Sequence, residues 1–401
     1  MVQIGDKFCS KAADPLIVKK GESGGSLTAL YKFLLEEGIV DAVLAVKRGA
    51  DIYDAAPVLI DNPEDVIESA GALHCGTLNM AVIIEKYLGG AFDIKIAVTT
   101  KPCDAMAINE LIKRGRIVRK NIIMLGINCG GTLPPIPTIK MLKSHGMDHD
   151  MVFNEEISKG KFIIEIEGNK RKEISIDELE EEGKGRRENC RRCEFNIPRT
   201  ADLTFGNWGI IDSSKNSFIE VLTDTGAEIL DKALNKGILR LEKAPAEGIM
   251  VREKIDKIMV KQAKKWQEKM FSHVNGEFLA VLFKYEADLS RCIKCFACKD
   301  SCPICYCSDC SLKSEIPEWV TNTEVPPKPL FHMERLMHMA DSCINCGQCE
   351  DVCPADIHLS KISHEINSNL REMFDYTPGI TDELPPFSYF LNKQMAKRFE
   401  G

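Results

Sequence analysis

Three absences limit what this chain can be. No uninterrupted apolar run in its 401 residues approaches the ~20 residues needed to cross a bilayer, so we expect no membrane span. The N-terminal segment, residues 1–16, lacks the apolar core and the cleavage site of a secretory signal. An excess of positive charge is also missing: the formal net charge is -8, which argues against nucleic acid as the main partner. We therefore expect a cytoplasmic protein.

Cysteine, by contrast, is abundant, with 17 residues. In a short secreted chain this number would indicate disulfides, but in a long cytoplasmic chain it indicates metal binding. The pattern C-x2-C-x2-C-x3-C-P occurs twice, with cysteines at Cys292, Cys295, Cys298 and Cys302 and again at Cys343, Cys346, Cys349 and Cys353. This doubled pattern is typical of a pair of 4Fe-4S clusters.

The spacing also predicts which cysteines share a cluster. Three cysteines at two-residue gaps wrap three corners of one cluster, and in two-cluster ferredoxins the fourth thiolate comes from the other copy. We therefore assign one cluster to Cys292, Cys295, Cys298 and Cys353, and the other to Cys343, Cys346, Cys349 and Cys302. Two zinc sites are the alternative, but structural zinc sites use ligand pairs separated by a longer stretch.

The N-terminal part alternates between strand-like and helix-like segments. We predict strands over 39–46, 57–60, 94–98, 122–125 and 217–223, and helices over 27–37, 63–70, 77–88, 105–114, 226–235 and 253–269. A charged hairpin is expected around 162–176, with Gly168 and Asn169 in its turn. Strands interleaved with helices predict an α/β domain with a mostly parallel sheet.

A glycine-rich segment precedes the helix predicted over 27–37. It contains Ser23, Gly24, Gly25 and Ser26, with Thr28 in the first helical turn. Bare backbone N–H groups at such a helix start can bind an anion such as a cofactor diphosphate. The segment is not the G-x-G-x-x-G fingerprint, and an ordinary loop before a helix explains it equally well.

Four further cysteines predict a third cluster. Cys103 and Cys129 each follow a predicted strand, where a parallel sheet places its functional residues. Cys190 and Cys193 form a C-x2-C pair, which needs two more ligands from elsewhere. We therefore expect a 4Fe-4S cluster on these four cysteines, with zinc on the same residues as the alternative.

Other features of this region have two interpretations. The arginines around the C-x2-C pair, Arg186, Arg187, Arg191 and Arg192, either form a solvated face or raise the potential of a neighbouring cluster. Asn207 and Trp208 lie between two glycines, so they form either a core turn or a close approach to a planar ring. Cys9, Cys75, Cys305, Cys307 and Cys310 receive no ligand role, and packing thiols are the expectation.

The chain therefore divides into four predicted parts. Residues 1–245 form the α/β domain with one cluster, and 246–285 form a helical linker. A helix-rich ferredoxin-type domain with two clusters occupies 286–360, and 361–401 form a C-terminal extension. Three clusters make a one-electron path that needs a terminal, and a flavin in the α/β domain would supply it, because a flavin accepts electrons singly and passes them on as a pair.

Several of these motifs together resemble a known family. Ser23–Leu30 with Glu36–Asp41, Lys101–Cys103, Asn128–Cys129, and Cys190–Cys193 with Ala201–Leu203 and Gly206 are similar to the beta-subunit family of the coenzyme F420-reducing hydrogenases and dehydrogenases, over roughly residues 15–245. The added two-cluster domain resembles the formate dehydrogenase branch of that family in methanogenic archaea. The segment Gly71–Cys75 departs from the family pattern, with Leu-His-Cys in place of Ser-Lys-Tyr.

The resemblance implies cofactors, partners and site residues. It implies FAD held by Ser23, Gly24, Gly25, Ser26 and Thr28, with Lys101, Asn207 and Trp208 as further contacts, and coenzyme F420 as the hydride-accepting substrate. It also implies that formate is oxidised on a separate molybdenum- or tungsten-pterin alpha subunit, whose electrons enter through the ferredoxin clusters. No side chain of this chain need act as acid or base.

Two other functions are compatible with the same motifs. The chain could serve another electron-donating partner, such as a hydrogenase or a heterodisulfide reductase complex. It could also be an electron-transfer and docking subunit without flavin catalysis of its own. Bound FAD and the identity of the co-purifying large subunit distinguish these possibilities.

Overall fold

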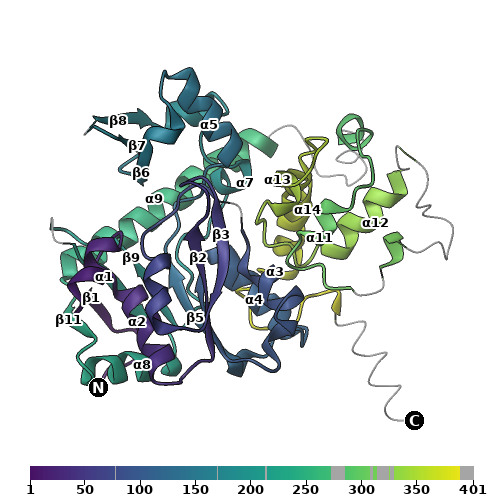
Figure 1. Ribbon diagram of the computed structural model, residues 1–401. Helices are drawn as coiled ribbons and strands as arrows, with labels where there is room; N and C mark the ends of the chain where they lie inside the picture. The colour runs from purple at the N-terminus through teal and green to yellow at the C-terminus, as the bar shows by residue number, and fades with distance from the viewer. Residues whose placement is uncertain are drawn as a thin grey trace, which may run out of the picture.

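The structure is a computed structural model (Figure 1). It describes residues 1–76, 78–168, 170–212, 215–271, 285–307, 310–313, 325 and 329–388. The N-terminal part forms a large sheet covered by helices, with a small second sheet beside it, and the C-terminal part is a group of helices packed against one side of this body (Figure 1). Within the described part of the chain, every helix is too short or too polar to span a bilayer.

The large sheet has eight strands in the order β11-β1-β10-β9-β5-β4-β2-β3. Their bounds are β1 Lys7–Ala12, β2 Ala42–Arg48, β3 Ala55–Ile60, β4 Ile96–Thr100, β5 Ile122–Ile127, β9 Leu203–Gly206, β10 Ser217–Val221 and β11 Leu239–Lys243. The four central strands β9, β5, β4 and β2 are parallel to one another, whereas β3 on one side and β10, β1 and β11 on the other are antiparallel to their neighbours. The predicted α/β domain is present, and its parallel part is the centre of the sheet.

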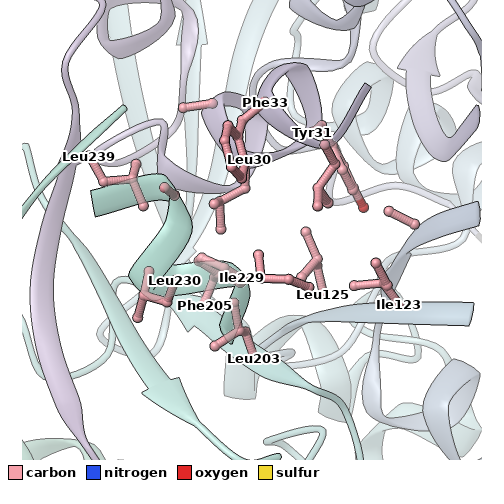
Figure 2. Packing of buried hydrophobic residues seen from close by; sticks show 14 of the residues in the cluster. Leu30, Tyr31, Phe33, Ile123, Leu125, Leu203, Phe205, Ile229, Leu230 and Leu239 are labelled. Carbon is pink, nitrogen blue, oxygen red and sulfur yellow. The ribbon is translucent and has the colours of Figure 1, made fainter. Parts of the chain in front are cut away.

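Helices cover both faces of this sheet. Their bounds are α1 Pro15–Lys20, α2 Ser26–Glu36, α3 Met80–Lys86, α4 Pro102–Lys113 and α8 Asp224–Asn235. Leu30 and Phe33 of α2 and Ile229 of α8 pack over β5 and β9 in one apolar cluster, as Figure 2 shows. Helices α3 and α4 form a second cluster on the opposite face, with alternate residues of β2, β4 and β5. Alternation along the strands thus supplies an apolar surface to each helix layer.

A small antiparallel sheet stands beside the large one. Its strands are β6 Val152–Ser158, β7 Lys161–Ile166 and β8 Lys170–Ser175. The predicted hairpin is confirmed by the register Phe162↔Ile174, although Asn169 lies outside the described residues. The neighbouring helices are α5 Pro135–Ser144, α6 Ile176–Glu181 and α7 Glu188–Arg191, and the 3-10 turns of the chain are η1 Pro63–Ser69, η2 Gly89–Ala91, η3 Arg119–Asn121, η4 His149–Met151 and η5 Ser311–Lys313.

The long helix α9, Ala246–Phe271, leads from the large sheet towards the cysteine-rich region. It begins seven residues earlier than the predicted helix over 253–269, and residues 272–284 of the predicted linker lie outside the described part. The cysteine-rich region contains α11 Ala297–Asp300, α12 Pro329–Met339, α13 Gln348–Asp351 and α14 Leu359–Phe374. Among its described residues there is no strand, which agrees with the helix-rich prediction.

The sequence patterns missed several elements. Strands β1, β9 and β11 and helix α1 were not predicted, because these strands are short and are stabilised by partners distant in the sequence. One prediction needs a correction: Cys103 lies in the first turn of α4 and not in a loop, since Pro102 starts the helix three residues before the predicted 105.

Candidate functional site

A cavity of about 300 Å³ opens at the carboxyl ends of the central strands. Its walls come from the loop before α2, from the segments that follow β4, β5 and β9, and from residues 71–76. Small-molecule sites occupy about 300–1,000 Å³ and lie at this edge of parallel sheets. The cavity therefore has the position and the size of a cofactor site.

The glycine-rich loop supplies one wall. Gly25 adopts a left-handed conformation, with φ 73°, directly before α2, and no side chain caps the first turn of this helix. Its free N–H groups and the positive end of the helix dipole suit a diphosphate. Four of the residues predicted to contact FAD line the cavity: Ser23, Gly25, Ser26 and Thr28.

Gly24 is not part of the lining. A Cβ at Gly24 would lie 2.4 Å from the carbonyl oxygen of Ser10, and its N–H donates to Ser217 Oγ at 3.0 Å. The residue is thus a glycine because β1 and β10 pass directly behind it. The predicted contact between Gly24 and FAD has no support in its position.

Lys101 brings a cation to the cavity wall. Its Nζ lies 2.8 Å from Oδ2 of the buried Asp104 and donates to the carbonyl oxygen of Leu78 at 2.9 Å. Burial opposes the charge, but the carboxylate of Asp104 raises the pKa of Lys101 above its usual value. Lys101 therefore remains charged at neutral pH.

Asn207 and Trp208 also line the cavity, on the turn after β9. The preceding residue, Gly206, has φ 156°, and a Cβ there would lie 1.7 Å from Oδ1 of Asn128. The close approach of the Asn128 side chain therefore explains Gly206, and Trp208 lines the cavity instead of filling a core.

The segment that departs from the family pattern also borders the cavity. Leu73 and His74 line it, whereas Cys75 is buried behind them and bridges to Leu133. Burial lowers the pKa of His74 to about 4, so its ring is neutral at pH 7. This part of the wall therefore adds no positive charge.

The four cysteines of the predicted third cluster come together beside this cavity. Cys103 lies in the first turn of α4, Cys129 follows β5, Cys190 lies in α7 and Cys193 just after it. Burial, and next the nearby Cys190 thiol, raise the pKa of Cys129 to about 11, and burial is also the main cause that raises the pKa of Cys193 to about 12. A metal reverses this tendency, because a coordinated thiol loses its proton. Cys129 also lines the cavity, so the two sites adjoin.

The ferredoxin motifs form two further cavities. One is lined by Cys292, Cys295, Cys298 and Cys353, and the other by Cys302, Cys343, Cys346 and Cys349. The last cysteine of each motif thus reaches the cavity of the other motif, which is the arrangement that we predicted from the spacing. Each cavity gathers four thiols, the number that a 4Fe-4S cluster requires.

Arg335 of α12 separates these two cavities and was missed from the sequence. Its guanidinium lines both of them, and its Nε donates to Cys298 Sγ at 3.3 Å. Burial disfavours its charge, but the surrounding thiols raise its pKa above the usual range. Arg335 was missed because which face of α12 meets the cysteines depends on the folded domain.

The arginines near Cys190 are buried and do not form a solvated face. Arg187 is 7% exposed, donates to the carbonyl oxygen of Cys346 at 3.0 Å, and pairs with Asp351. Arg192 is fully buried and donates to Ser360 Oγ at 2.6 Å. Cations therefore lie where α7 meets the second ferredoxin motif.

The cysteine sites are also connected through one apolar cluster. Cys103, Cys302 and Cys346 all pack against the cluster formed by α3, α4 and the central strands. Ile304 and Ile344, which lie beside ferredoxin cysteines, are buried members of this cluster. The second ferredoxin cavity and the Cys103 site therefore share a dry boundary.

Comparison with known proteins identifies the family. Models described as the N-terminal and C-terminal parts of the coenzyme F420 hydrogenase/dehydrogenase beta subunit match residues 8–85 and 93–247, and a 4Fe-4S dicluster domain model matches 288–357. The chain is 46% identical to the F420-dependent formate dehydrogenase subunit beta of Methanocaldococcus jannaschii, over 94% of this chain and 97% of the relative. It is 43% identical to the F420-dependent formate dehydrogenase 1 subunit beta of Methanococcus maripaludis, over 95% and 97%.

A solved structure supports the fold. A chain of the F420-reducing hydrogenase complex from Methanosarcina barkeri superposes with a TM-score of 0.58 at 22% identity, over 67% of this chain and 93% of that chain. At this identity the likeness concerns the fold alone. The family models and the formate dehydrogenase relatives confirm the resemblance inferred from the motifs: the chain belongs to the coenzyme F420 hydrogenase/dehydrogenase beta-subunit family.

Proposed function

We propose that this chain passes electrons from formate oxidation, on a partner alpha subunit, through three 4Fe-4S clusters to FAD, which reduces coenzyme F420. The observation that carries the proposal is the unbroken series of cavities. Two four-cysteine cavities meet at Arg335, the second borders the Cys103 site through shared apolar packing, and Cys129 of that site lines the large cavity. The full-length similarity to two F420-dependent formate dehydrogenase beta subunits supports the same function.

The residues at the large cavity suit FAD. The uncapped start of α2, at Gly25 and Ser26, and the ammonium of Lys101 are positive and would hold the diphosphate. Asn207 and Trp208 line the same cavity and would border the ring system. When bound, FAD accepts single electrons from iron-sulfur clusters and releases them in pairs as hydride.

The surroundings of the cysteines favour transfer inside the protein. Arg187, Arg192 and Arg335 place buried positive charge beside the thiols, which stabilises the extra electron of a reduced cluster. The buried residues Ile304 and Ile344 exclude water between the second ferredoxin cavity and α4. Hydride transfer needs no acid or base from the chain, so positioning and charge are its contributions.

The relatives support a partner subunit, because both are named as beta subunits. The alpha subunit, with its molybdenum- or tungsten-pterin, would deliver electrons to the cluster of the first ferredoxin motif, which comes first in the series of cavities. A heterodisulfide reductase complex is a further candidate partner. Co-purification of the tagged chain from its own cells, followed by identification of the large subunit, tests this part.

The decisive experiment is an anaerobic assay of the purified chain reconstituted with FAD and iron-sulfur clusters. Reduced viologen is the donor and coenzyme F420 is the acceptor, and we expect the F420 absorbance to bleach while NAD is not reduced. Cys129→Ala should abolish bleaching, because it removes the cysteine between the third site and the cavity. Cys9 lies on β1, away from the cavities, so Cys9→Ala should retain the bleaching of F420.

Three outcomes would contradict the proposal. Intact clusters and bound FAD without bleaching of F420 would mean that the cavity serves another acceptor. A chain that binds no FAD under any reconstitution condition would instead be a docking and electron-transfer subunit. A third site that purifies with zinc would remove the path between the ferredoxin domain and the cavity.

A further inference from the structure

The stretch that follows α14 lies outside the matched family models, which end at residue 357. After Phe374 the chain turns through Asp375, with φ 48°, and residues 375–388 return across α4 (Figure 1). We call this stretch the clasp. It connects two parts of the molecule that carry different cysteine sites.

One end of the clasp is bound to α4. Tyr376 is buried and donates its hydroxyl to Glu110 Oε1 at 2.5 Å, and the Gly379 N–H donates to the same oxygen at 2.6 Å. Lys113 adds an ion pair to Glu110 at 3.1 Å and lies over the Tyr376 ring. Glu110 has no exposed surface, and all three donors bind its Oε1, while its Oε2 is buried without a hydrogen-bond partner.

Gly379 shows how closely the clasp fits. Its φ is 72°, and a Cβ at this position would lie 2.4 Å from both Cα and O of Met106. Asn109 also donates to the Gly379 carbonyl oxygen at 3.2 Å. Backbone therefore packs directly on backbone here, and only glycine permits this distance.

The other end of the clasp is bound to the ferredoxin region. The N–H of Phe387 donates to Oδ2 of the buried Asp341 at 2.8 Å. Asp341 lies two residues before Cys343, and its other oxygen accepts from Ser342 at 2.7 Å. Arg114, just after α4, reaches the same Asp341–Ser342 pair.

The middle of the clasp closes the space between two cysteine sites. Cys193, of the third site, and Cys343, of the second ferredoxin site, line one small cavity, and Thr377 and Pro378 of the clasp complete its wall. Helix α4 carries Cys103 in its first turn and holds the clasp near its other end. The clasp thus ties the helix that carries Cys103 to the segment that carries Cys343.

We propose that the clasp sets the separation between the third cluster and the second ferredoxin cluster and excludes water between them, with Glu110 and Gly379 as its positioning residues. This inference rests on the proposed function, because it concerns electron transfer between those clusters. Electron transfer depends steeply on separation, so a loosened clasp slows the step without removing either cluster.

The test compares two shortened chains. One ends at residue 374 and lacks the clasp, and the other ends at residue 388 and retains it. Both are reconstituted, and their iron and flavin contents are measured first. Electron paramagnetic resonance of the reduced protein then reports the spin–spin interaction between neighbouring clusters, and stopped-flow absorbance reports flavin reduction by viologen. We expect the chain ending at 374 to lose the interaction and to reduce its flavin roughly tenfold more slowly, a change that ~1.4 kcal/mol of barrier produces.

Point variants decide the matter if the shorter chain loses clusters. Gly379→Ala and Glu110→Gln should weaken the spin–spin interaction at full iron content, while Asn109→Ala, which removes a single part-buried hydrogen bond, should change it less. If the spin–spin interaction and the rate of flavin reduction stay unchanged in these variants, the proposed role of the clasp is wrong. Absence of flavin reduction in the chain ending at 388 would instead contradict the proposed function, so the two failures are distinguishable.

Discussion

The two copies of the ferredoxin motif have the same cysteine spacing but opposite surroundings. Ile293, between the first two cysteines of the first copy, is 54% exposed, whereas its counterpart Ile344 is 5% exposed. Cys295 is exposed and Cys346 is not. Ile344 is buried because it joins the apolar cluster of α3 and α4. The spacing thus builds two similar ligand loops, and the residues between the cysteines decide that one faces solvent and the other faces the N-terminal domain.

Backbone conformation sharpens this contrast. Both loops use left-handed residues at the same positions, Lys294 and Phe296 in the first copy and Asn345 and Gly347 in the second. A side chain is tolerated at Phe296 because it packs edge-to-face on Phe331. A Cβ at Gly347 would lie 2.3 Å from the side chain of Asn189 in α7. The second loop therefore needs glycine because it touches the other domain.

The largest difference should come from the cations of the two copies. Arg187→Gln leaves Asp351 without its buried partner, and we expect a loss of about 3–5 kcal/mol in the stability of the domain contact. Arg291→Gln at the first copy removes an exposed pair with Asp288 and should cost about 0–1 kcal/mol. Anaerobic denaturant titration followed by cluster absorbance measures both. Equal losses would mean that the two copies are equivalent.

Apolar contacts give the next largest effect. Ile344→Ala should cost about 2–5 kcal/mol, because it leaves a cavity in the cluster shared with α4. The matched change Ile293→Ala should stay within about 0.5 kcal/mol, since this side chain is mostly in water. The same titration, combined with limited proteolysis of the domain junction, tests the pair. A large effect of Ile293→Ala would show that the first copy is also covered.

The difference between Phe296 in the first loop and Gly347 in the second predicts a smaller effect on stability. Gly347→Ala should destabilise by about 1–3 kcal/mol through overpacking against Asn189. Phe296→Gly relieves about 1–2 kcal/mol of left-handed strain but loses an aromatic contact worth about 0.5–1.5 kcal/mol, so little net change is expected. Denaturation midpoints of the two variants decide this, and a tolerated Gly347→Ala would contradict the close approach.

Histidines beside the two cavities predict opposite pH dependence. Burial lowers the pKa of His332, at the first cavity, to about 4, so its contribution to stability is complete above the unfolded pKa of ~6.5 and is lost as the pH falls towards 4. The hydrogen bond to Glu350 raises the pKa of His358, at the second copy. That contribution is complete below ~6.5 and is lost as the pH rises through the raised pKa.

Variants separate these two titrations. His332→Leu should flatten the acidic side of the pH–stability profile, and His358→Gln should flatten the neutral-to-alkaline side. Both profiles come from denaturant midpoints measured across the pH range. Identical profiles for the two variants would show that neither histidine titrates in the folded state as its surroundings imply.

Much of the fold could be predicted because local chemistry specifies it. The spacing of apolar residues predicted the helix over 27–37, and the structure contains it as α2, Ser26–Glu36. The central strands β4 and β5 appeared from short apolar runs. The domain boundaries predicted at 245, 285 and 360 stay a prediction, although β11 ends at Lys243 and α9 begins at Ala246.

The sequence by itself determined the ligand chemistry, because cysteine spacing dictates which thiols one cluster can reach, and the family, because its motifs are local. Only the tertiary structure decided what surrounds those ligands. Arg187, Arg335 and Glu110 are polar residues whose burial depends on helices distant in the chain, and Gly24 and Gly379 are glycines because other backbone passes beside them. Such contacts join residues up to hundreds of positions apart, and no local pattern encodes them.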